Sequence, residues 1–269
     1  MNAARPATPR GAIWVAADWF LFAADSEAYD PAVNTTGSLL IGPLGPWRVR
    51  EGPRVHEGRV MVHAAHVSST GSGRGLITLW PVPTTPLAQL LKKLAPGTCE
   101  GQRVRRLDHL LQAPGIAALV EAFDALKTGG GDTAALAATV ARLEQDLATD
   151  QPPSAPIDPR AAALALRLRD PATAALRATA HAEALALSPD RLRHLFVDAF
   201  DLRMSQFGAW LKLHAALRYV AEAARKPSIT DAAQAGGFAD AAHLANMARR
   251  MFAMKPSETL PASFRFIAV

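Results

Sequence analysis

Basic and polar side chains collect on one face of each of two short helices predicted near the end of the chain. The first helix is predicted over Pro189–Phe200, and the second begins at about Asp240. Arginine can hydrogen-bond guanine through two nitrogens and asparagine can do the same with adenine, so such a face can read bases in a major groove. A solvated charged surface is the alternative for any single helix of this kind. The side chains that we single out for DNA contact are Asp190, Arg191, Arg193, His194, Asp240, His243, Asn246, Arg249 and Arg250.

Each of these helices follows another short helix after a tight turn. Leu185–Leu187 precedes the cap-and-proline signal Ser188-Pro189, and Gly236-Gly237 precedes Asp240, which can cap the next helix. A helix-turn-helix needs such a turn so that its second helix can stand out and enter a groove. A long helix is predicted between the units, from about Ser205 to Arg225. The helical steps from Gln206 to Lys226 would span roughly 30 Å, close to one turn of B-DNA. Two recognition helices at its ends could occupy successive major grooves.

The charge of the chain is distributed unevenly. The net charge is +5, but residues 1–159 hold 14 Lys and Arg against 15 Asp and Glu, whereas residues 160–269 hold 15 against 9. A basic excess confined to one segment is typical of a module that binds a polyanion. The single cysteine, Cys99, excludes an internal disulfide and fits a reducing cytoplasm, where we expect the protein to be located.

No segment predicts a membrane span or a signal peptide. The longest N-terminal apolar stretch, Ile13–Ala24, is interrupted by Asp18 and is well short of the roughly 20 residues that a membrane helix needs. We therefore expect no membrane partner.

Strand-forming and turn residues dominate the first third of the chain. Gly-Pro pairs and Gly-rich turns separate short apolar runs at near-regular spacing between residues 13 and 95, which predicts a small β-sandwich or barrel. Four of the five tryptophans lie there, and we expect them mainly in the core, with an aromatic ligand cavity as the alternative. Helices are predicted over 87–94, 104–111, 115–126 and 133–147. Their leucine stripe would pack on the barrel, and part of it could form a two-fold interface.

A proline-rich stretch separates this part from a region that we expect to be entirely helical. Four prolines between residues 150 and 159 read as a linker. The sequence thus predicts an effector-binding and dimerisation domain over 1–150, a linker over 151–160 and a DNA-binding domain over 161–269.

The chain lacks the arrangements that would predict an enzyme. It has no Ser/His/Asp set and no phosphate-binding glycine loop, and Cys99 lies beside Glu100 rather than in a basic setting that would stabilise a thiolate. His63 and His66, three residues apart, would point to opposite faces of a strand and do not converge on one ion. We predict no catalytic residue, no metal and no cofactor. His56, His63 and Arg48 are possible polar groups in an effector cavity, whose lining the sequence leaves unknown.

The C-terminal region resembles the DNA-binding domain of the AraC/XylS family of bacterial transcription regulators. The segments that carry the resemblance are Leu187–Phe196, Trp210–Leu213, Ile229–Leu244, Arg249–Phe252 and Lys255–Ser257. It implies an α+β chain with a small cupin-like barrel and following helices, a linker and an all-α domain with two helix-turn-helix units joined by a long helix. It also implies a sequence-specific regulator of promoter DNA, with a small-molecule effector, RNA polymerase and a second copy of the chain as further partners.

Four positions depart from the family pattern. Asn246 stands where the family usually has a basic residue, Ala248 stands where it has a core phenylalanine, and Asp201 and Ala253 replace the glycines that commonly end the recognition helices. Losing a basic residue weakens phosphate binding by reducing counterion release. An alternative function is therefore a degenerate regulator that acts through protein–protein contacts, with weakened DNA binding by the second unit.

Overall fold

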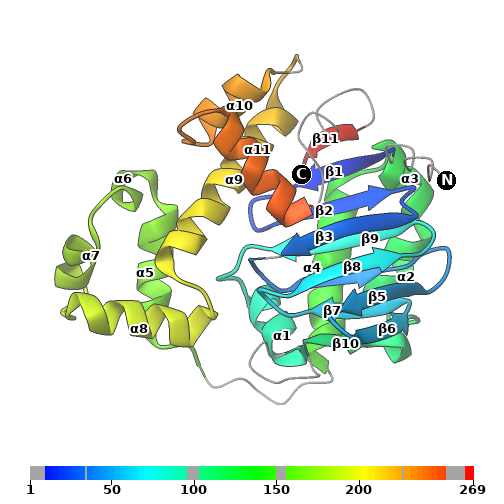
Figure 1. Cartoon of the computed structure of the whole chain (residues 1–269), viewed down its shortest axis with the longest axis horizontal. Coiled ribbons are helices and arrows are strands. Elements are labelled where there is room, and N and C mark those ends of the chain that lie inside the picture. Colours follow the sequence, from blue (N-terminus) through cyan, green and yellow to red (C-terminus); the bar gives the residue numbers. More distant parts are fainter. Residues whose placement is uncertain (1–9, 34, 96–102, 150–155, 226, 253–263) are drawn as a thin grey trace.

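The N-terminal part of the chain folds into two packed β-sheets (Figure 1). The computed structural model describes residues 10–33, 35–95, 103–149, 156–225, 227–252 and 264–269. Within them, a seven-stranded sheet has the order β10-β7-β4-β9-β2-β1-β11, and a four-stranded sheet has the order β3-β8-β5-β6. The strands are β1 (Gly11–Val15), β2 (Trp19–Ala24), β3 (Ala28–Val33), β4 (Ser38–Ile41), β5 (Trp47–Glu51), β6 (Arg54–Gly58), β7 (Val60–His63), β8 (Ser68–Ser72), β9 (Leu76–Pro81), β10 (Val104–Arg106) and β11 (Phe264–Ala268).

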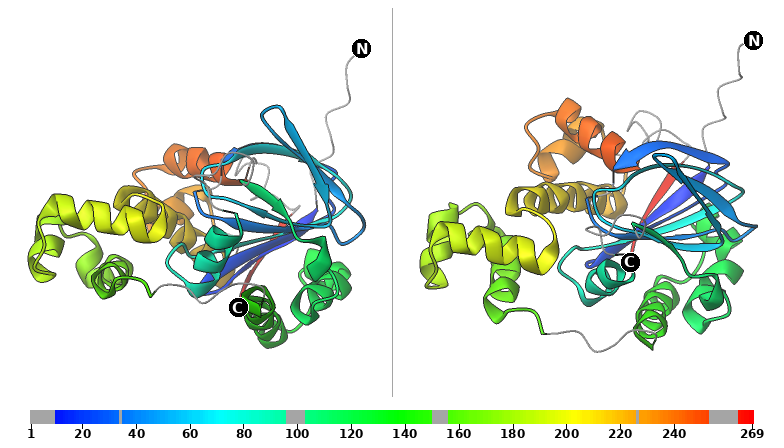
Figure 2. Two further views of the ribbon diagram at one scale, coloured as in Figure 1. Left: turned by 90° about the horizontal axis from the view of Figure 1, so that it is seen from below. Right: turned by 60° about the horizontal axis from the view of Figure 1, so that its bottom comes forward.

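Helices cover the seven-stranded sheet (Figure 2). Helices α1 (Pro86–Leu94) and α3 (Phe123–Thr128) contact its strands directly, while α2 (Pro114–Glu121) and α4 (Thr133–Thr149) pack on each other, and α4 also packs on α1. The strands under these helices are buried on both faces, as the run of six buried residues in β2 shows. This arrangement confirms the predicted cupin-like barrel with following helices.

The tryptophans of this region are core residues, as predicted. Trp14, Trp19, Trp47 and Trp80 are each at least nine-tenths buried. The Trp14 indole donates to the Leu126 carbonyl at 3.1 Å, and the Trp47 indole donates to the Gly75 carbonyl at 2.6 Å. Both rings therefore bury their apolar surface without losing their hydrogen bond.

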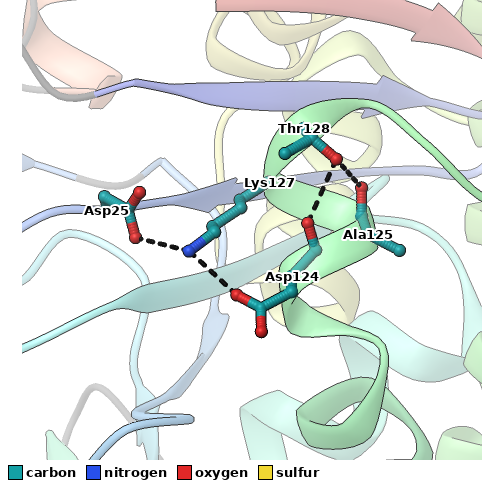
Figure 3. A network of polar contacts seen from close by, with 5 residues as sticks. All are labelled: Asp25, Asp124, Ala125, Lys127 and Thr128. Atoms are coloured by element: carbon teal, nitrogen blue, oxygen red, sulfur yellow. Dashed lines mark hydrogen bonds and ion pairs between the residues drawn. The ribbon is translucent and has the colours of Figure 1, made fainter.

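Helix α3 is fixed to the edge of the sheet by charge as well as by packing. Lys127 lies 3.0 Å from the Asp25 carboxylate at the end of β2 and 2.9 Å from the Asp124 carboxylate in its own helix (Figure 3). Its hydrogen bonds to Asp124 and Asp25 raise the pKa of the Lys127 ammonium. The ammonium also lies 5.1 Å from the centre of the Phe123 ring, and all these contacts hold the helix in one register on the sheet.

The prediction of a helix over 104–111 is wrong. Val104–Arg106 is strand β10, paired antiparallel with β7 so that Val104 lies opposite His63, and a short 3₁₀ turn follows over Asp108–Leu110. The Asp108 carboxylate accepts from the backbone nitrogens of Arg59 and Val60 at 2.7 and 3.0 Å. These partners are more than forty residues away in sequence, so local periodicity could not reveal the strand.

The leucine stripe of the following helices is used inside the chain. Leu107, Leu119 and Leu126 are each at least nine-tenths buried, and no large apolar side chain described in 104–147 is exposed. Packing on the barrel, the simpler of the two predicted uses, is thus confirmed. Homodimerisation stays a prediction and would need another surface.

Helices make up most of the C-terminal part, shown at the left and top of Figure 1. The Asp170 side chain accepts from the Ala172 nitrogen, so a separate short helix begins at Pro171. The division of the chain at 151–160 stays a prediction. The helices are α5 (Pro159–Arg169), α6 (Pro171–Ala174), α7 (Ala178–Ala184), α8 (Pro189–Phe200), α9 (Met204–Glu222), α10 (Ile229–Ala235) and α11 (Ala241–Phe252).

The C-terminal strand returns to the N-terminal sheet, which corrects the expectation that everything after the linker is helical. Strand β11 pairs in parallel with β1 from Gly11–Phe264 to Val15–Ala268. The Phe264 ring lies 5.5 Å from the Phe22 ring, and the Arg265 guanidinium donates to the Thr128 carbonyl at 3.2 Å. Since its partner strand lies at the other end of the chain, no local pattern announced this strand. The sheet thus combines strands from both ends of the chain.

Helix α9 is packed against the sheet by an aromatic column. Phe20 in β2 stacks between Trp80, at 5.1 Å between ring centres, and Trp210 in α9, at 5.6 Å. Trp210 stacks in turn on His214 at 5.2 Å, and His214 Nε2 donates to the Ala16 carbonyl at 2.7 Å.

No helix in the described ranges is long and apolar enough to cross a bilayer.

Burial lowers the pKa of three histidines among the described residues, His63, His181 and His214, and the two with large shifts predict how stability depends on pH. Burial lowers the pKa of His63 and of His214 to about 4, from an ordinary value of 6.5, because it disfavours the imidazolium form. For each of these two histidines the folded pKa lies below the unfolded one. The contribution of the neutral imidazole to the free energy of unfolding is therefore complete above pH 6.5, and it is lost as the pH falls towards 4. Each difference corresponds to roughly 3 kcal/mol.

We therefore expect the Tm to fall by roughly 10 °C between pH 7.5 and pH 5, and His63→Leu to remove about half of that fall. Calorimetry at both pH values measures it. His194→Gln, which replaces an exposed histidine, is the control, and its Tm should fall by the full amount between the two pH values. An equal fall in the His63→Leu and His194→Gln proteins would show that the buried imidazole is not responsible.

Candidate nucleic-acid interface

The two helix pairs α7–α8 and α10–α11 are joined by the same turn. In the first, the Leu187 nitrogen donates to the Ala182 carbonyl at 2.9 Å, and the Ala186 nitrogen donates to the Glu183 carbonyl at 3.1 Å. In the second, Phe238 donates to Ala233 at 2.9 Å and Gly237 to Gln234 at 3.0 Å. In each helix pair, the two bonds together define a Schellman motif at the end of the first helix. The structure thus has two helix-turn-helix units.

Side-chain caps begin the second helix of each unit. Ser188 Oγ accepts from the Arg191 nitrogen at 3.2 Å, and Asp240 Oδ1 accepts from the His243 nitrogen at 2.7 Å. Both were predicted as caps from the sequence. The Asp240 carboxylate, which we also singled out for DNA contact, is therefore occupied in holding the helix start.

The second helix of each unit, α8 and α11, presents its predicted residues to solvent. Their opposite faces are buried, by Leu192, Leu195 and Phe196 in α8 and by Leu244 and Ala248 in α11. The exposed residues are Asp190, Arg191, Arg193 and His194 in the first unit, and Asp240, His243, Asn246, Arg249 and Arg250 in the second. We call these two exposed sets the first and second recognition faces.

Neighbouring groups restrain two of these side chains. The Arg193 guanidinium forms an exposed ion pair with Asp190 at 2.5 Å, one turn earlier in α8. The His243 ring meets the Phe238 ring edge-on at 5.1 Å between centres. Arg193 therefore has an acidic neighbour on its own helix, and His243 has a packing role besides any contact with DNA.

Helix α9 joins the two units and contacts both of them. Its 19 residues from Met204 to Glu222 correspond to about 28 Å, slightly less than predicted from the sequence. Near one end the Phe207 ring packs on Phe196 of α8 at 5.6 Å. At the middle of α9 a Cβ on Gly236 would come within 2.6 Å of the Lys212 carbonyl, so only glycine allows α10 to approach α9 this closely.

The departures from the family pattern have modest structural effects. Asp201 ends α8 in the left-handed region at φ 59°, where a glycine is commonly found, and its nitrogen donates to the Val197 carbonyl at 2.7 Å. Ala248 is buried, with Met247 half-buried beside the core. Asn246 is exposed. Ala253 and Cys99 lie outside the described residues.

Sequence reasoning missed several residues near the recognition faces. Val197 follows His194 by one turn of α8 and is 40 % exposed, so the helical spacing could have added it to the first face. Lys92 and His66 come from the N-terminal part and contact the end of α8, where Lys92 Nζ lies 3.3 Å from the Asp198 carbonyl. No local signal could have found these two residues.

The structure separates His63 from His66 and places Arg48 on the surface of the barrel. His63 is buried in β7. His66 follows that strand, and its Nε2 contacts the Asp201 carbonyl at 3.2 Å. Arg48 faces solvent and pairs with Glu57 at 3.0 Å. Across the described residues, no group of three or more His, Cys, Asp or Glu could hold an ion.

Comparison with known proteins agrees with this geometry. Residues 181–262 match the family model of a helix-turn-helix domain, which confirms the resemblance to the AraC type. No curated protein sequence matches the chain.

Solved structures of ToxT from Vibrio cholerae share the fold. The apo form of a ToxT variant aligns with a TM-score of 0.56 at 10% identity, over 90% of this chain and 96% of that one. ToxT bound to a methylnaphthalenyl butenoic acid gives 0.54 at 9% identity, over 89% and 96%. ToxT bound to an unsaturated fatty acid gives 0.53 at 9% identity, over 91% and 95%. At such identities the likeness shows the fold of the chain.

The repeated turn yields a matched pair of stability predictions. Ala186 and Gly237 occupy the same place in the two turns, at φ 53° and 69°, a region that disfavours a Cβ. We expect Ala186→Gly to stabilise the protein by about 0.5–1 kcal/mol and Gly237→Ala to destabilise it by a similar amount. A steric clash is not the cause of the destabilisation by Gly237→Ala, because a Cβ on Gly237 would meet only Lys212 Cε, at 3.9 Å.

Urea unfolding of the full chain measures both effects. Ala184→Gly, at the exposed last residue of α7, is the control and should destabilise the protein. A loss of stability in Ala186→Gly as large as in Ala184→Gly would contradict the strained turn.

Proposed function

We propose that the chain is a sequence-specific DNA-binding transcription regulator whose two recognition helices enter successive major grooves on one side of a duplex. The observation that carries the proposal is the repeated unit itself. Two turns with the same hydrogen bonds present two capped helices with polar outer faces, and α9, about 28 Å long, connects the two units. Adjacent major grooves on one face of B-DNA are about 34 Å apart, and two units joined by a helix of this length can reach both.

The chemistry of the recognition faces supports this function. Arg191 and Arg193 on the first face can each hydrogen-bond guanine, and Asn246 on the second face can hydrogen-bond adenine. Arg249 and Arg250, in the last turn of α11, can neutralise phosphates. Val197 offers an apolar surface that could contact a thymine methyl group.

A small-molecule effector is a further part of the proposal. ToxT, which shares the fold, has been crystallised with an unsaturated fatty acid and with a methylnaphthalenyl butenoic acid. We propose that an effector of this chain also acts through the N-terminal domain. RNA polymerase and a second copy of the chain are proposed partners, and the cytoplasm, where promoter DNA is accessible, is the proposed location.

A second candidate function follows from the second recognition face. Asn246 carries no charge where a basic residue is usual, so the second unit would bind DNA weakly, and the chain could act through protein–protein contacts instead. Three cationic or ionisable side chains, His243, Arg249 and Arg250, remain exposed on α11. They favour DNA contact by both units.

The first test is the loss of a base contact. Genomic fragments retained by the purified chain at about 0.15 M salt would supply the site, since non-specific binding is weak there. Arg193→Ala should weaken binding to that site by about 1–3 kcal/mol and relax the preference at one base pair. Arg218→Ala, which breaks a comparable exposed ion pair with Glu222 on α9, is the control and should leave binding unchanged. Equal affinities of the two variants would remove Arg193 from the interface.

The second test separates the two candidate functions. Adding a cation by Asn246→Arg should strengthen binding and steepen its salt dependence by about one phosphate equivalent, if the second face lies on DNA. Titrations at several salt concentrations measure the slope. An unchanged slope would place position 246 away from the phosphates and favour the degenerate regulator.

A further inference from the structure

The C-terminal end of the first recognition helix is capped by the N-terminal domain. The last carbonyls of a helix lack partners within it and attract cations and hydrogen-bond donors. In α8, Lys92 Nζ lies 3.3 Å from both the Asp198 and the Ala199 carbonyls, and His66 Nε2 lies 3.2 Å from the Asp201 carbonyl. Because a carbonyl only accepts, the His66 imidazole donates through Nε2. Lys92 belongs to α1 and His66 follows β7, so both caps come from outside the helix-turn-helix units.

His66 is itself held by an arginine. Its backbone is in the left-handed region at φ 61°, unusual for a residue with a Cβ. The Arg103 guanidinium donates through Nη2 to the His66 carbonyl at 3.0 Å and thereby holds this conformation. The imidazole can reach α8 only from a backbone placed in this way.

Arg103 connects in turn to a buried acid and a histidine. Arg103 Nε lies 3.5 Å from Glu51 Oε1, and Glu51 Oε2 lies 3.6 Å from His56 Nε2. Glu51 ends β5 and His56 lies in β6, both in the four-stranded sheet. A continuous series of polar contacts therefore runs from the four-stranded sheet through Arg103 and His66 to the end of α8.

The inner contacts of this series are incompletely satisfied. Arg103 Nε, Glu51 Oε2 and His56 Nε2 are buried, and each lacks a hydrogen bond in the described structure. Buried polar atoms without partners are costly, so the three groups gain by any small movement that improves their pairing. Such a movement would shift Arg103 and, through it, His66.

We propose that Arg103 and His66 are positioning residues, which couple the buried Glu51–His56 pair of the barrel to the last turn of the first recognition helix. Neither side chain contacts DNA in this scheme. They order the end of α8, and a change at Glu51 or His56 reaches the first recognition face through them. This inference rests on the proposed function for its effect on DNA, but its structural part can be tested without DNA.

Hydrogen exchange in the full-length protein tests the structural part. Arg103→Met removes the guanidinium, and His66→Asn removes the imidazole but keeps a residue that tolerates the left-handed region. We expect each variant to speed exchange of the α8 amides over 197–201 by about 3–10-fold. The double variant should exchange no faster than His66→Asn alone, because Arg103 acts through His66. Arg48→Met, which breaks an exposed pair with Glu57 in the four-stranded sheet, is the control and should leave α8 unchanged.

DNA binding then tests the functional part. On the selected fragments, Arg103→Met and His66→Asn should weaken binding by about 3–10-fold without changing the salt slope, since no phosphate contact is lost. A slope reduced by about one would mean that Arg103 touches phosphate, and would overturn the positioning role. Exchange unchanged in both single variants, or additive in the double variant, would also overturn it.

The outcomes separate this inference from the proposed function. If the wild-type chain selects no DNA, the proposed function fails, while the exchange experiment still decides the coupling. If Arg103→Met does not fold, Arg103→Lys replaces it, because lysine keeps the charge beside Glu51 but loses the second donor that reaches the His66 carbonyl. Faster exchange in that variant supports the coupling, and wild-type exchange contradicts it.

Discussion

Helix α9 must satisfy two packing requirements at once, and the rest of the structure depends on this. One part of its surface joins the aromatic column of the sheet, through Trp210 on Phe20 and the bond from His214 to the Ala16 carbonyl. Other parts carry the two helix-turn-helix units, through Phe207 on Phe196 and the close approach of Gly236 to the Lys212 carbonyl. The separation of the recognition helices and their attachment to the barrel are therefore set by one rigid element.

The barrel and the helical part are joined at several further points. Strand β11 extends the seven-stranded sheet beside β1, and Arg169 forms an ion pair with Asp18 at 2.6 Å. Lys92 and His66 reach the end of α8. An exposed ion pair alone contributes little, but strand pairing and aromatic burial are substantial. A change inside the barrel thus has physical contacts through which it can act on the recognition faces.

Local signals in the sequence identified the parts of the fold that local chemistry determines. Cap residues such as Ser188 and Asp240, and the turn at Gly236-Gly237, located both helix-turn-helix units. The sequence could not reveal features that depend on distant partners. Strand β10 was predicted as a helix, β11 was missed, and the caps supplied by Lys92 and His66 lie more than 100 residues from the helix that they cap. The nine predicted recognition residues are all exposed, as their helical spacing required.

The most direct test of the central claim is to change the spacing of a selected DNA site. If α9 holds the two recognition helices rigidly, inserting about five base pairs between the two recognised elements turns one of them to the opposite side of the duplex. Binding measured by titration should then fall to that of a site with one element deleted. Affinity that is unchanged by the insertion would contradict the account, because it would mean that the two units do not read one duplex through a fixed connection.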